Sequence, residues 1–362
     1  MIRVVSRFSL IRRTLLTLVV VSLLLVMVGC ESEADLAAVL PTPYAYQVAY
    51  TATPIITSTP TIAPTATVNR LITLTPTPDP YRDLYITSLI SRNYGGGVLE
   101  DMGNLNGAVD FTRKLFRYRS EGLDLYGFIN IPQGEGPFPV IVMAHGYIDP
   151  VQFSTLDYSV RYADALTEAG YIAIHPNLRG YAPSEDGENV LGTGDAIDVL
   201  NLIALIRQQA GSEGLLKNAD SERIGLWGHS MGGVVVMRTL IVDQEVKAGL
   251  LYASINADES INLSHFEKDG RGNEKTDAPR EILNLLSPKN YLDQITAPLV
   301  IFHGGKDEVV PVNWSRNLCL ALDGIGKEVT CREYPDQPHT FQNSGDAQFI
   351  KEMVAFFDAH VR

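Results

Sequence analysis

The sequence predicts an α/β fold in which helices cover both faces of a mostly parallel sheet of eight strands. Two observations support this prediction. Several short runs are continuously apolar, such as Val140-Ile141-Val142-Met143, which is typical of parallel strands that are buried on both faces. These runs alternate along the chain with longer stretches that carry apolar residues at helical spacing. Such alternation is the pattern of an α/β sandwich.

The periodicity of the apolar residues places each element. The expected strands are residues 115–119, 123–129, 140–144, 171–175, 223–227, 248–252, 299–303 and 328–334. The expected helices are residues 80–90, 157–169, 195–210, 231–242, 314–322 and 347–361. Glu121 and Gly122 stand between the first two strands, which predicts an antiparallel hairpin at one edge of the sheet. Asp79 and Pro80 suit the N-cap and the first position of the first helix.

Residues 1–29 have the pattern of a secretory signal. Four arginines carry all the charge before residue 30, and residues 15–28 are apolar apart from Thr17 and Ser22. This run is shorter than the ~20 residues that span a bilayer comfortably. It ends in Gly29-Cys30, which resembles the lipobox of bacterial lipoproteins, where the cysteine is acylated. We therefore expect a lipid anchor on Cys30 at the outer face of a bacterial membrane; the alternatives are a signal anchor and a structural cysteine.

Residues 30–80 are predicted to form an extended stalk. The stretch 41–80 holds eight of the chain's 20 prolines and eleven threonines, and such sequence buries too little surface to fold. At ~3.1 Å per residue, the stalk would reach on the order of 100–150 Å. Recognition by a proline-binding partner is the alternative, but the stretch lacks a PxxP motif with flanking arginine or aromatic residues. Residues 81–362 are then expected to form a single catalytic domain.

The composition limits the classes of partner. A net charge of −13 and a pI near 5.0 disfavour nucleic acid, because lysine and arginine supply most of the affinity for phosphate backbones. Loss of residues 1–29 removes four positive charges and no negative ones, which changes the net charge from −13 to −17. Anionic lipid headgroups would repel so acidic a protein, so a membrane anchor has to come from acyl chains. Three cysteines are too few for a disulfide-dense scaffold. Cys319 and Cys331 remain, either as a disulfide or as free thiols.

The most specific motif in the chain is Gly228-His229-Ser230-Met231-Gly232. It directly follows an apolar strand and directly precedes a helical run, which is the context of a G-x-S-x-G nucleophile elbow. In such a turn the serine oxygen is held above the sheet at the N-terminus of a helix. We therefore expect Ser230 to be a catalytic nucleophile; the alternative is a structural turn.

A serine hydroxyl needs a base to take its proton, and the base needs an anionic partner that holds its tautomer. In this fold the chain order is serine, then acid, then histidine. Asp307 follows the expected strand 299–303, and His339 lies in a loop after the last strand. We expect Asp307 to be the acid and His339 to be the base, with Glu308 as the alternative acid.

The oxyanion of a tetrahedral intermediate requires hydrogen-bond donors, which are usually main-chain N–H groups. The first is expected from Met231, directly after the nucleophile. The second is expected from the loop that follows the strand 140–144, where the chain reads His145-Gly146-Tyr147. We therefore expect the N–H of Tyr147 to be the second donor, since Gly146 lets the backbone approach closely. The alternative is a plain strand-to-helix turn.

The other histidines are expected to have structural roles. Four of them stand at or beside strand ends, where a ring bonded to the backbone is the usual outcome: His145, His175, His229 and His303. His265 and His360 are expected at the surface. None has the spacing of a metal ligand with a carboxylate or a cysteine, so we expect no metal and no other cofactor.

Several stretches together resemble the catalytic domain of the prolyl oligopeptidase family and the related dienelactone-hydrolase-like enzymes. They are 123–146 with Gly127 and Pro132, 177–184, 287–298, 304–311 and His339. The resemblance covers residues 112 to 360. The stretch 177–184 matches the family's R-G-x-G-x-S turn in part, because Ala182 stands where the family has its second glycine. The resemblance implies an α/β-hydrolase fold.

The resemblance also implies the activity of a serine peptidase on a small-molecule or short-peptide substrate. Full-length prolyl oligopeptidases carry a large β-propeller before this domain, and here that position holds the expected stalk and a short helix. Hydrolysis of small esters or amides is therefore the broader expectation. A carboxylesterase of the dienelactone-hydrolase type is the first alternative, and a binding protein on a hydrolase scaffold is the second. The polar stretch 256–291 is expected either to cap the site or to form a solvated loop with one short helix at 280–286.

Overall fold

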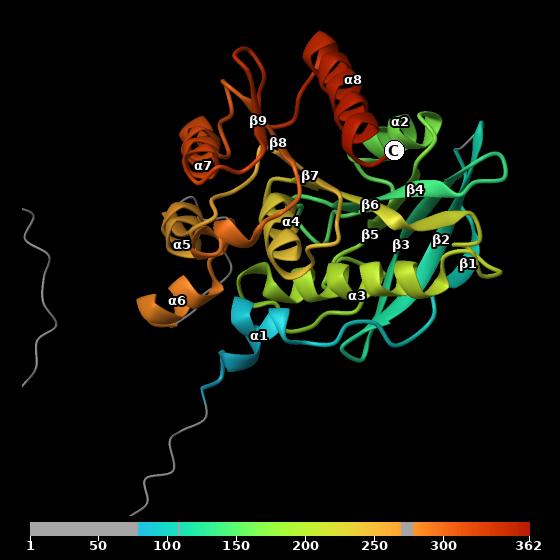
Figure 1. Ribbon diagram of the computed structural model, residues 1–362, viewed down its shortest axis with the longest axis horizontal. Helices are drawn as coiled ribbons and strands as arrows, with labels where there is room; N and C mark the ends of the chain where they lie inside the picture. The colour runs from blue at the N-terminus through green and yellow to red at the C-terminus, as the bar shows by residue number, and fades with distance from the viewer. Residues whose placement is uncertain (1–78, 108, 269–277) are drawn as a thin grey trace, which may run out of the picture. The chain divides into compact units, whose positions relative to one another are not determined.

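The structure is a computed structural model that describes residues 79–107, 109–268 and 278–362 (Figure 1). The predictions made for the N-terminal part, namely the signal 1–29, the lipidated Cys30 and most of the stalk 30–80, lie outside these described residues. Within the ranges described, no helix is long and apolar enough to cross a membrane.

The described residues form one sheet of nine strands, in the order β1-β2-β3-β5-β4-β6-β7-β8-β9. Neighbouring strands from β1 to β5 are antiparallel, and all neighbouring pairs from β5 through β4 to β9 are parallel. The prediction of a mostly parallel sheet is therefore confirmed. The strands are Glu100–Asn104 (β1), Phe111–Ser120 (β2), Leu123–Pro132 (β3), Phe138–Ala144 (β4), Ile172–Pro176 (β5), Ala219–His229 (β6), Ala248–Tyr252 (β7), Leu299–Gly304 (β8) and Val329–Tyr334 (β9).

Strand β1 was not predicted, so the expectation of eight strands is wrong by one. The strand lies at the edge of the sheet and pairs with β2 alone among the described strands. Four of its five residues are exposed, and Gly103 within it has a φ of 110°. A short edge strand with no buried face has no alternation of apolar and polar residues. The sequence therefore held no periodic signal that could have revealed it.

Most helices lie where the sequence predicted them. The expected first helix is divided into the 3₁₀ turn η1 and the helix α1, and helix α5 was not predicted. The helices are Ile86–Ile90 (α1), Val160–Glu168 (α2), Thr193–Gln209 (α3), Met231–Val242 (α4), Glu259–Lys268 (α5), Arg280–Leu286 (α6), Val312–Gly324 (α7) and Asn343–His360 (α8), with 3₁₀ turns at Arg82–Leu84 (η1), Val190–Gly192 (η2), Pro288–Asn290 (η3) and Leu292–Gln294 (η4).

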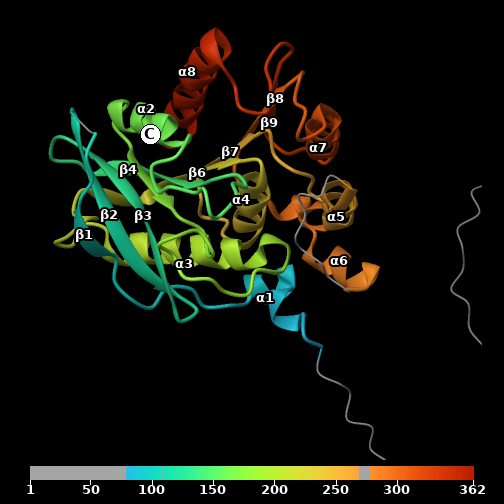
Figure 2. The same ribbon diagram turned by 180° about the vertical axis from the view of Figure 1, so that it is seen from behind.

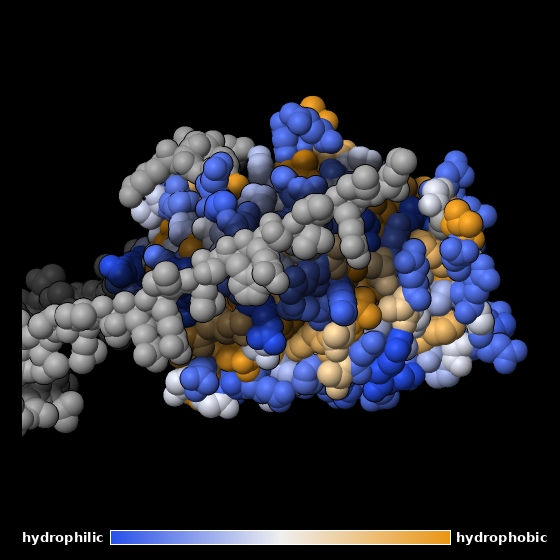
Figure 3. All heavy atoms as spheres, turned by 90° about the horizontal axis from the view of Figure 1, so that it is seen from above, coloured by the Kyte–Doolittle hydropathy of each residue, from blue (hydrophilic) through white to orange (hydrophobic). Residues whose placement is uncertain are grey.

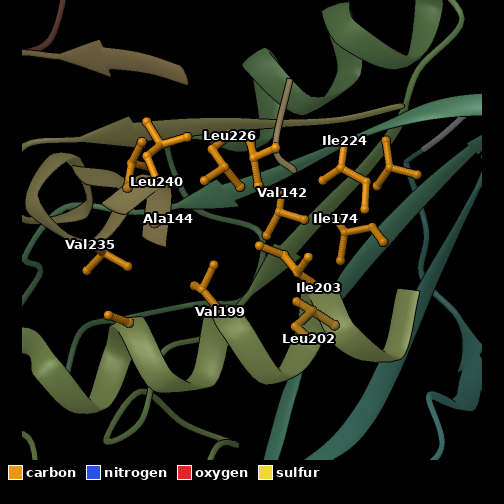
Figure 4. Close-up of a cluster of buried hydrophobic side chains, with 14 of the residues drawn as sticks. Val142, Ala144, Ile174, Val199, Leu202, Ile203, Ile224, Leu226, Val235 and Leu240 are labelled. Carbon is orange, nitrogen blue, oxygen red and sulfur yellow. The ribbon is translucent and has the colours of Figure 1, made fainter. Parts of the chain in front are cut away.

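The core lies on both faces of the sheet. Along β4, Val142 and Ala144 belong to one buried apolar cluster, and Ile141 and Met143 belong to a second. Helices α3 and α4 cover the first face, and α2 and α8 cover the second (Figures 1 and 2). Figure 4 shows the first cluster, in which side chains of β4, β5 and β6 meet those of α3 and α4. Burial on both faces explains why β4 is apolar at consecutive positions.

The surface of the described part carries both polar and apolar side chains. Viewed from above, hydrophilic and hydrophobic residues are intermixed on the described surface (Figure 3). Three of the most exposed large apolar side chains are Val109, Val151 and Leu320, which lie in different elements or loops. Scattered apolar side chains are an ordinary feature of folded proteins.

A disulfide links the edge of the sheet to a neighbouring helix. Cys319 of α7 is bonded to Cys331 of β9 in the structure. The sequence left this pair open between a disulfide and two free thiols. Strand β9 is the last strand at this edge, and four of its six residues are exposed. The bond therefore joins an exposed edge strand covalently to the helix that packs on it.

An ion pair is buried where the loop after β5 meets helix α3. The guanidinium of Arg179 donates to both carboxylate oxygens of Asp198, at 2.8 and 2.6 Å. It also donates to Glu121 in the turn of the hairpin β2–β3, at 3.0 Å. The side chain of Asp198 is fully buried, and that of Arg179 is 3% exposed. Through the guanidinium of Arg179, these bonds link the hairpin β2–β3, the loop after β5 and helix α3.

Two histidines are buried beside each other at the ends of β4 and β5. The rings of His145 and His175 stack with their centroids 5.6 Å apart. Burial lowers the pKa of His145 to about 4 and that of His175 to about 3. Nδ1–H of His145 donates to the carbonyl of Gly146, and Nε2 accepts the N–H of Leu178. Both rings are therefore neutral in the folded protein near pH 7.

Removal of the buried carboxylate should destabilise the fold. Asp198→Ala leaves the guanidinium of Arg179 buried with only Glu121 to balance it, so we expect a loss of about 3 kcal/mol in the free energy of unfolding. Urea denaturation followed by circular dichroism measures this loss. Glu213→Ala is the matched control, because its pair with Lys217 is exposed and should contribute less than about 0.5 kcal/mol. Equal effects of the two variants would contradict the expectation.

Stability should fall in mild acid. The pKa values of His145 and His175 in the folded state lie below the usual ~6.5 of the unfolded chain, so the unfolded state binds more protons below pH 6.5. The stabilisation is complete above pH 6.5 and is lost as the pH falls towards 4 and then 3. Between pH 6.5 and 5 we expect a loss on the order of 3 kcal/mol from the two rings. Urea denaturation at several pH values in this interval measures the slope of the free energy of unfolding against pH. The slope should be shallower in His175→Gln. A flat slope in the unaltered protein would contradict the interpretation.

Candidate active site

Ser230 stands in a strained turn between β6 and α4. Its backbone has a φ of 54° and a ψ of −116°, and only 7% of the residue is exposed. The N–H of Ser230 donates to the carbonyl of Tyr252, and its own carbonyl accepts the N–H of Ile255. A serine adopts such a φ only when the surrounding structure fixes it. The geometry is that of the strand-to-helix turn predicted from the sequence motif.

The glycines around Ser230 are required because the backbone segments approach so closely. A Cβ atom at Gly228 would lie 2.3 Å from the carbonyl oxygen of Gly232. A Cβ atom at Gly232 would lie 2.0 Å from the carbonyl oxygen of Ala144, at the end of β4. Real Cβ atoms do not come this close to backbone oxygen, so both positions accept only glycine. The ends of β4 and β6 and the start of α4 therefore converge on Ser230.

Asp307 and His339 meet at the same edge of the sheet. The side chain of Asp307, in the loop after β8, is fully buried, and its Oδ2 lies 2.7 Å from Nδ1 of His339. Oδ1 of Asp307 accepts the N–H groups of Val309 and Val310, both at 2.8 Å. The neighbouring Glu308 is exposed. Of the two carboxylates that the sequence offered, the structure therefore brings Asp307 to the histidine.

His303 is a further member of this site, and the sequence analysis gave it only a structural role. Its Nε2 lies 3.0 Å from Oδ2 of Asp307 and 3.0 Å from the carbonyl of Val310. Its Nδ1 lies 2.7 Å from the hydroxyl of Ser315, and the side chain is 2% exposed. Nε2 must carry the ring proton, because its partners are a carboxylate and a carbonyl, which only accept. The spacing of His303 and Asp307, four residues apart across a strand end, is the signal that could have revealed this contact.

The contacts of Asp307 determine its charge. Burial raises the pKa of the Asp307 carboxyl, but hydrogen bonds from His303 and His339, the positive charge that His339 can carry and the N–H of Val310 lower it by more. The net effect holds the pKa well below its ordinary value. Asp307 is therefore ionised near neutral pH, and it can stabilise a positive charge on the ring of His339.

The loop after β4 lies against Ser230. A Cβ atom placed on Gly146 would be 3.0 Å from Cβ of Ser230 and 3.1 Å from Nδ1 of His229. The next residue, Tyr147, is half exposed. On the other side of the turn, Met231 is the first residue of α4, where N–H groups have no partner within the helix. The two N–H groups expected to bind an oxyanion thus lie on the segments that flank Ser230.

The ring of His339 lies beside the elbow. It is centred 4.7 Å from the ring of His229, the residue before Ser230, and its side chain is 16% exposed. The loop that carries it is held by Tyr252, whose hydroxyl accepts the N–H of Phe341. Nδ1 of His339 is engaged with Asp307, so Nε2 is the nitrogen left for a proton transfer.

Helix α5 reaches the site from the stretch 256–291, which the sequence left open between a cap and a loop. Nε2 of His265 lies 3.2 Å from the carbonyl of Val309, and its ring contacts Trp314 of α7. His265, which was expected at the surface, is therefore partly buried against the loop that carries Asp307. Residues 269–277 of this stretch lie outside the described part of the chain.

A cavity of about 130 Å³ lies beside the elbow. Its wall includes Ile255, whose N–H donates to the carbonyl of Ser230, together with Ser254 of the same loop and Trp314 and Leu318 of α7. Most of its lining is apolar.

Among the described residues, no group of three or more histidine, cysteine, aspartate or glutamate side chains is placed to hold a metal ion.

A comparison with known protein families matches a part of the chain that includes most residues of this site. The model of the prolyl oligopeptidase family matches residues 157–362, a range that contains Ser230, Asp307 and His339. The uncharacterized peptidase YuxL of Bacillus subtilis is 25% identical over 259 residues, which are 67% of this chain and 38% of YuxL. The esterase YjfP of Escherichia coli is 27% identical over 248 residues, which are 64% of this chain and 92% of YjfP.

The solved structures agree with the sequence relatives. An acylaminoacyl peptidase of Pyrococcus horikoshii superimposes with a TM-score of 0.55 at 26% identity, over 70% of this chain and 42% of that enzyme. This chain therefore spans less than half the length of YuxL and of the P. horikoshii enzyme. The described residues have the α/β-hydrolase fold, as predicted. Since the family model matches more than half of the sequence, the chain belongs to the prolyl oligopeptidase family.

Proposed function

We propose that this protein is a serine hydrolase that cleaves ester or amide bonds through an acyl-enzyme, with Ser230 as nucleophile, His339 as base and Asp307 as the acid that orients it. The observation that carries the proposal is the bond between Nδ1 of His339 and buried Asp307, beside the strained turn at Ser230. Membership in the prolyl oligopeptidase family supports it, as do relatives named peptidase and esterase.

The geometry supports the following sequence of steps. Oγ of Ser230 attacks the carbonyl carbon of the substrate, and its proton passes to Nε2 of His339. The carbonyl oxygen becomes an oxyanion, which the N–H groups of Met231 and Tyr147 bind. The C–O or C–N bond to the leaving group then breaks, and the leaving group takes the proton from His339. A water molecule, deprotonated by His339, hydrolyses the acyl-enzyme and regenerates the hydroxyl of Ser230.

The charges around the site favour this order of reaction steps. Ionised Asp307 carries a negative charge next to the ring on which a positive charge develops, and burial of that carboxylate strengthens the attraction. Met231 stands at the positive end of the α4 dipole, close to the position at which the oxyanion forms. The protein therefore complements both charges of the transition state.

Peptidase activity on a small-molecule or short-peptide substrate is the first candidate, by family. An esterase activity is the second, because relatives are named esterase as well as peptidase, and the chain covers 92% of the esterase YjfP.

Labelling with a fluorophosphonate probe tests the nucleophile. We expect the probe to attach to Ser230, and we expect Ser230→Ala to remain unlabelled and to lose at least about 10³-fold in kcat. Ser221→Ala is the matched control, because Ser221 lies on the same strand and bonds only to exposed Glu222 in the described structure. Folded Ser230→Ala that still binds the probe or keeps its activity would falsify the role of Ser230 as nucleophile. A binding protein would be the better interpretation if the unaltered protein neither took up the probe nor hydrolysed any substrate. Rates on a panel of p-nitrophenyl esters and aminoacyl amides would then separate esterase from peptidase.

We propose further that Cys30 is acylated and anchors the enzyme to the outer face of a bacterial membrane. The support is the sequence of residues 1–30, with its basic and apolar segments before Gly29-Cys30. We expect the full chain to partition into the detergent phase of Triton X-114 and Cys30→Ala to remain unprocessed or enter the aqueous phase. Ser32→Ala is the control and should partition like the unaltered chain. Incorporation of labelled palmitate into Cys30→Ala would contradict the assignment.

A further inference from the structure

Three hydrogen bonds join the loop after β4 to the loop that carries His339. The N–H of Gly146 lies 2.9 Å from the hydroxyl oxygen of Tyr158. The same hydroxyl lies 2.7 Å from Nδ1 of His229. Nε2 of His229 lies 3.2 Å from the main-chain carbonyl of His339. The path thus starts beside Tyr147 and ends at the residue proposed as the base.

Only one arrangement of protons satisfies all three bonds. The carbonyl of His339 can only accept, so Nε2 of His229 carries the ring proton and donates it. Nδ1 of the neutral ring then accepts, and the hydroxyl of Tyr158 must donate to it. The oxygen of Tyr158 in turn accepts the N–H of Gly146. Because every donor points the same way along the path, each bond polarises and strengthens the next.

The surroundings of His229 keep this arrangement fixed. The residue is 3% exposed, and its ring is centred 4.4 Å from the ring of Tyr252 and 5.3 Å from that of Tyr158. Burial, together with the nearby ring of His339, holds the pKa of His229 well below its ordinary value. The ring therefore remains neutral and keeps its tautomer when His339 takes up a proton.

We infer that Tyr158 and His229 are positioning residues that hold two loops as one unit on either side of Ser230, namely the loop after β4 with Tyr147 and the loop that carries His339. The inference rests on the proposed function, since it concerns the geometry of the same reaction. The bond to Tyr158 engages the N–H of Gly146 and fixes the backbone directly before Tyr147, whose N–H is the proposed donor of this loop. The bond from His229 fixes the backbone of His339, whose ring must reach both Asp307 and Ser230.

Three variants test the inference on the full chain, and all three should fold. Tyr158→Phe removes the central hydroxyl, His229→Leu removes both ring nitrogens, and His229→Gln retains a donor that can reach the carbonyl of His339. For Tyr158→Phe and His229→Leu we expect kcat to fall by about 10-fold or more while KM changes less than about 2-fold, because the loss affects the transition state. We expect His229→Gln to retain more of kcat than His229→Leu.

The double variant Tyr158→Phe/His229→Leu gives the sharper test. If the two residues act as one unit, its kcat should lie within about 3-fold of the slower single variant, whereas independent contributions would multiply. Tyr171→Phe is the matched control. Its hydroxyl is also hydrogen-bonded, to Asp358, but lies outside this path, so its kcat should equal that of the unaltered protein. Thermal unfolding of every variant shows that each assay is run on folded protein.

The outcomes separate this inference from the proposed function. If Ser230→Ala keeps its activity, the proposed function is wrong and the inference falls with it. If Ser230→Ala is inactive and Tyr158→Phe has the kcat of the unaltered protein, only the positioning role is overturned. Multiplied losses in the double variant, or a loss confined to KM, would also overturn it.

Discussion

The lack of room for a side chain at Gly228 and Gly232 is the constraint on which the site depends. At these positions the ends of β4 and β6 and the first turn of α4 pass so closely that a Cβ atom would meet backbone oxygen at 2.3 and 2.0 Å. The chain can turn this sharply only if Ser230 adopts a positive φ. The apolar clusters on both faces of the sheet hold these segments together and so stabilise the strained turn.

The features that the sequence predicted are those that depend on local pattern. Strands such as β4 are apolar at every position because they are buried on both faces, and the nucleophile turn needs glycines at fixed places. Strand β1 escaped prediction because it has no buried face to impose alternation. The contact of His303 with Asp307 was not predicted from the sequence, because it depends on how the loop after β8 folds back. The ion pair of Arg179 and Asp198 joins residues 19 apart and has no local signal either.

The histidines of this protein differ in what they do, because their surroundings differ. His145 and His175 are buried, have lowered pKa values and act as neutral hydrogen-bonding groups in the core. His229 and His303 are equally buried but direct their Nε2 protons to the carbonyl of His339 and the carboxylate of Asp307. The ring of His339 keeps contact with solvent and with an ionised partner, as the proton transfer proposed for it requires. Environment, more than position along the chain, divides these roles.

The disulfide has a consequence for the durability of the site. Helix α7 follows the loop of Asp307, and strand β9 precedes the loop of His339, so the bond between Cys319 and Cys331 joins the two elements next to the proposed acid and base. Strand β9 lies at the edge of the sheet, where strands separate most readily because only one neighbour holds them. A covalent link at this edge limits how far β9 can separate from α7 when the edge of the sheet frays. The bond therefore constrains, through the chain itself, the segments that lead to Asp307 and His339.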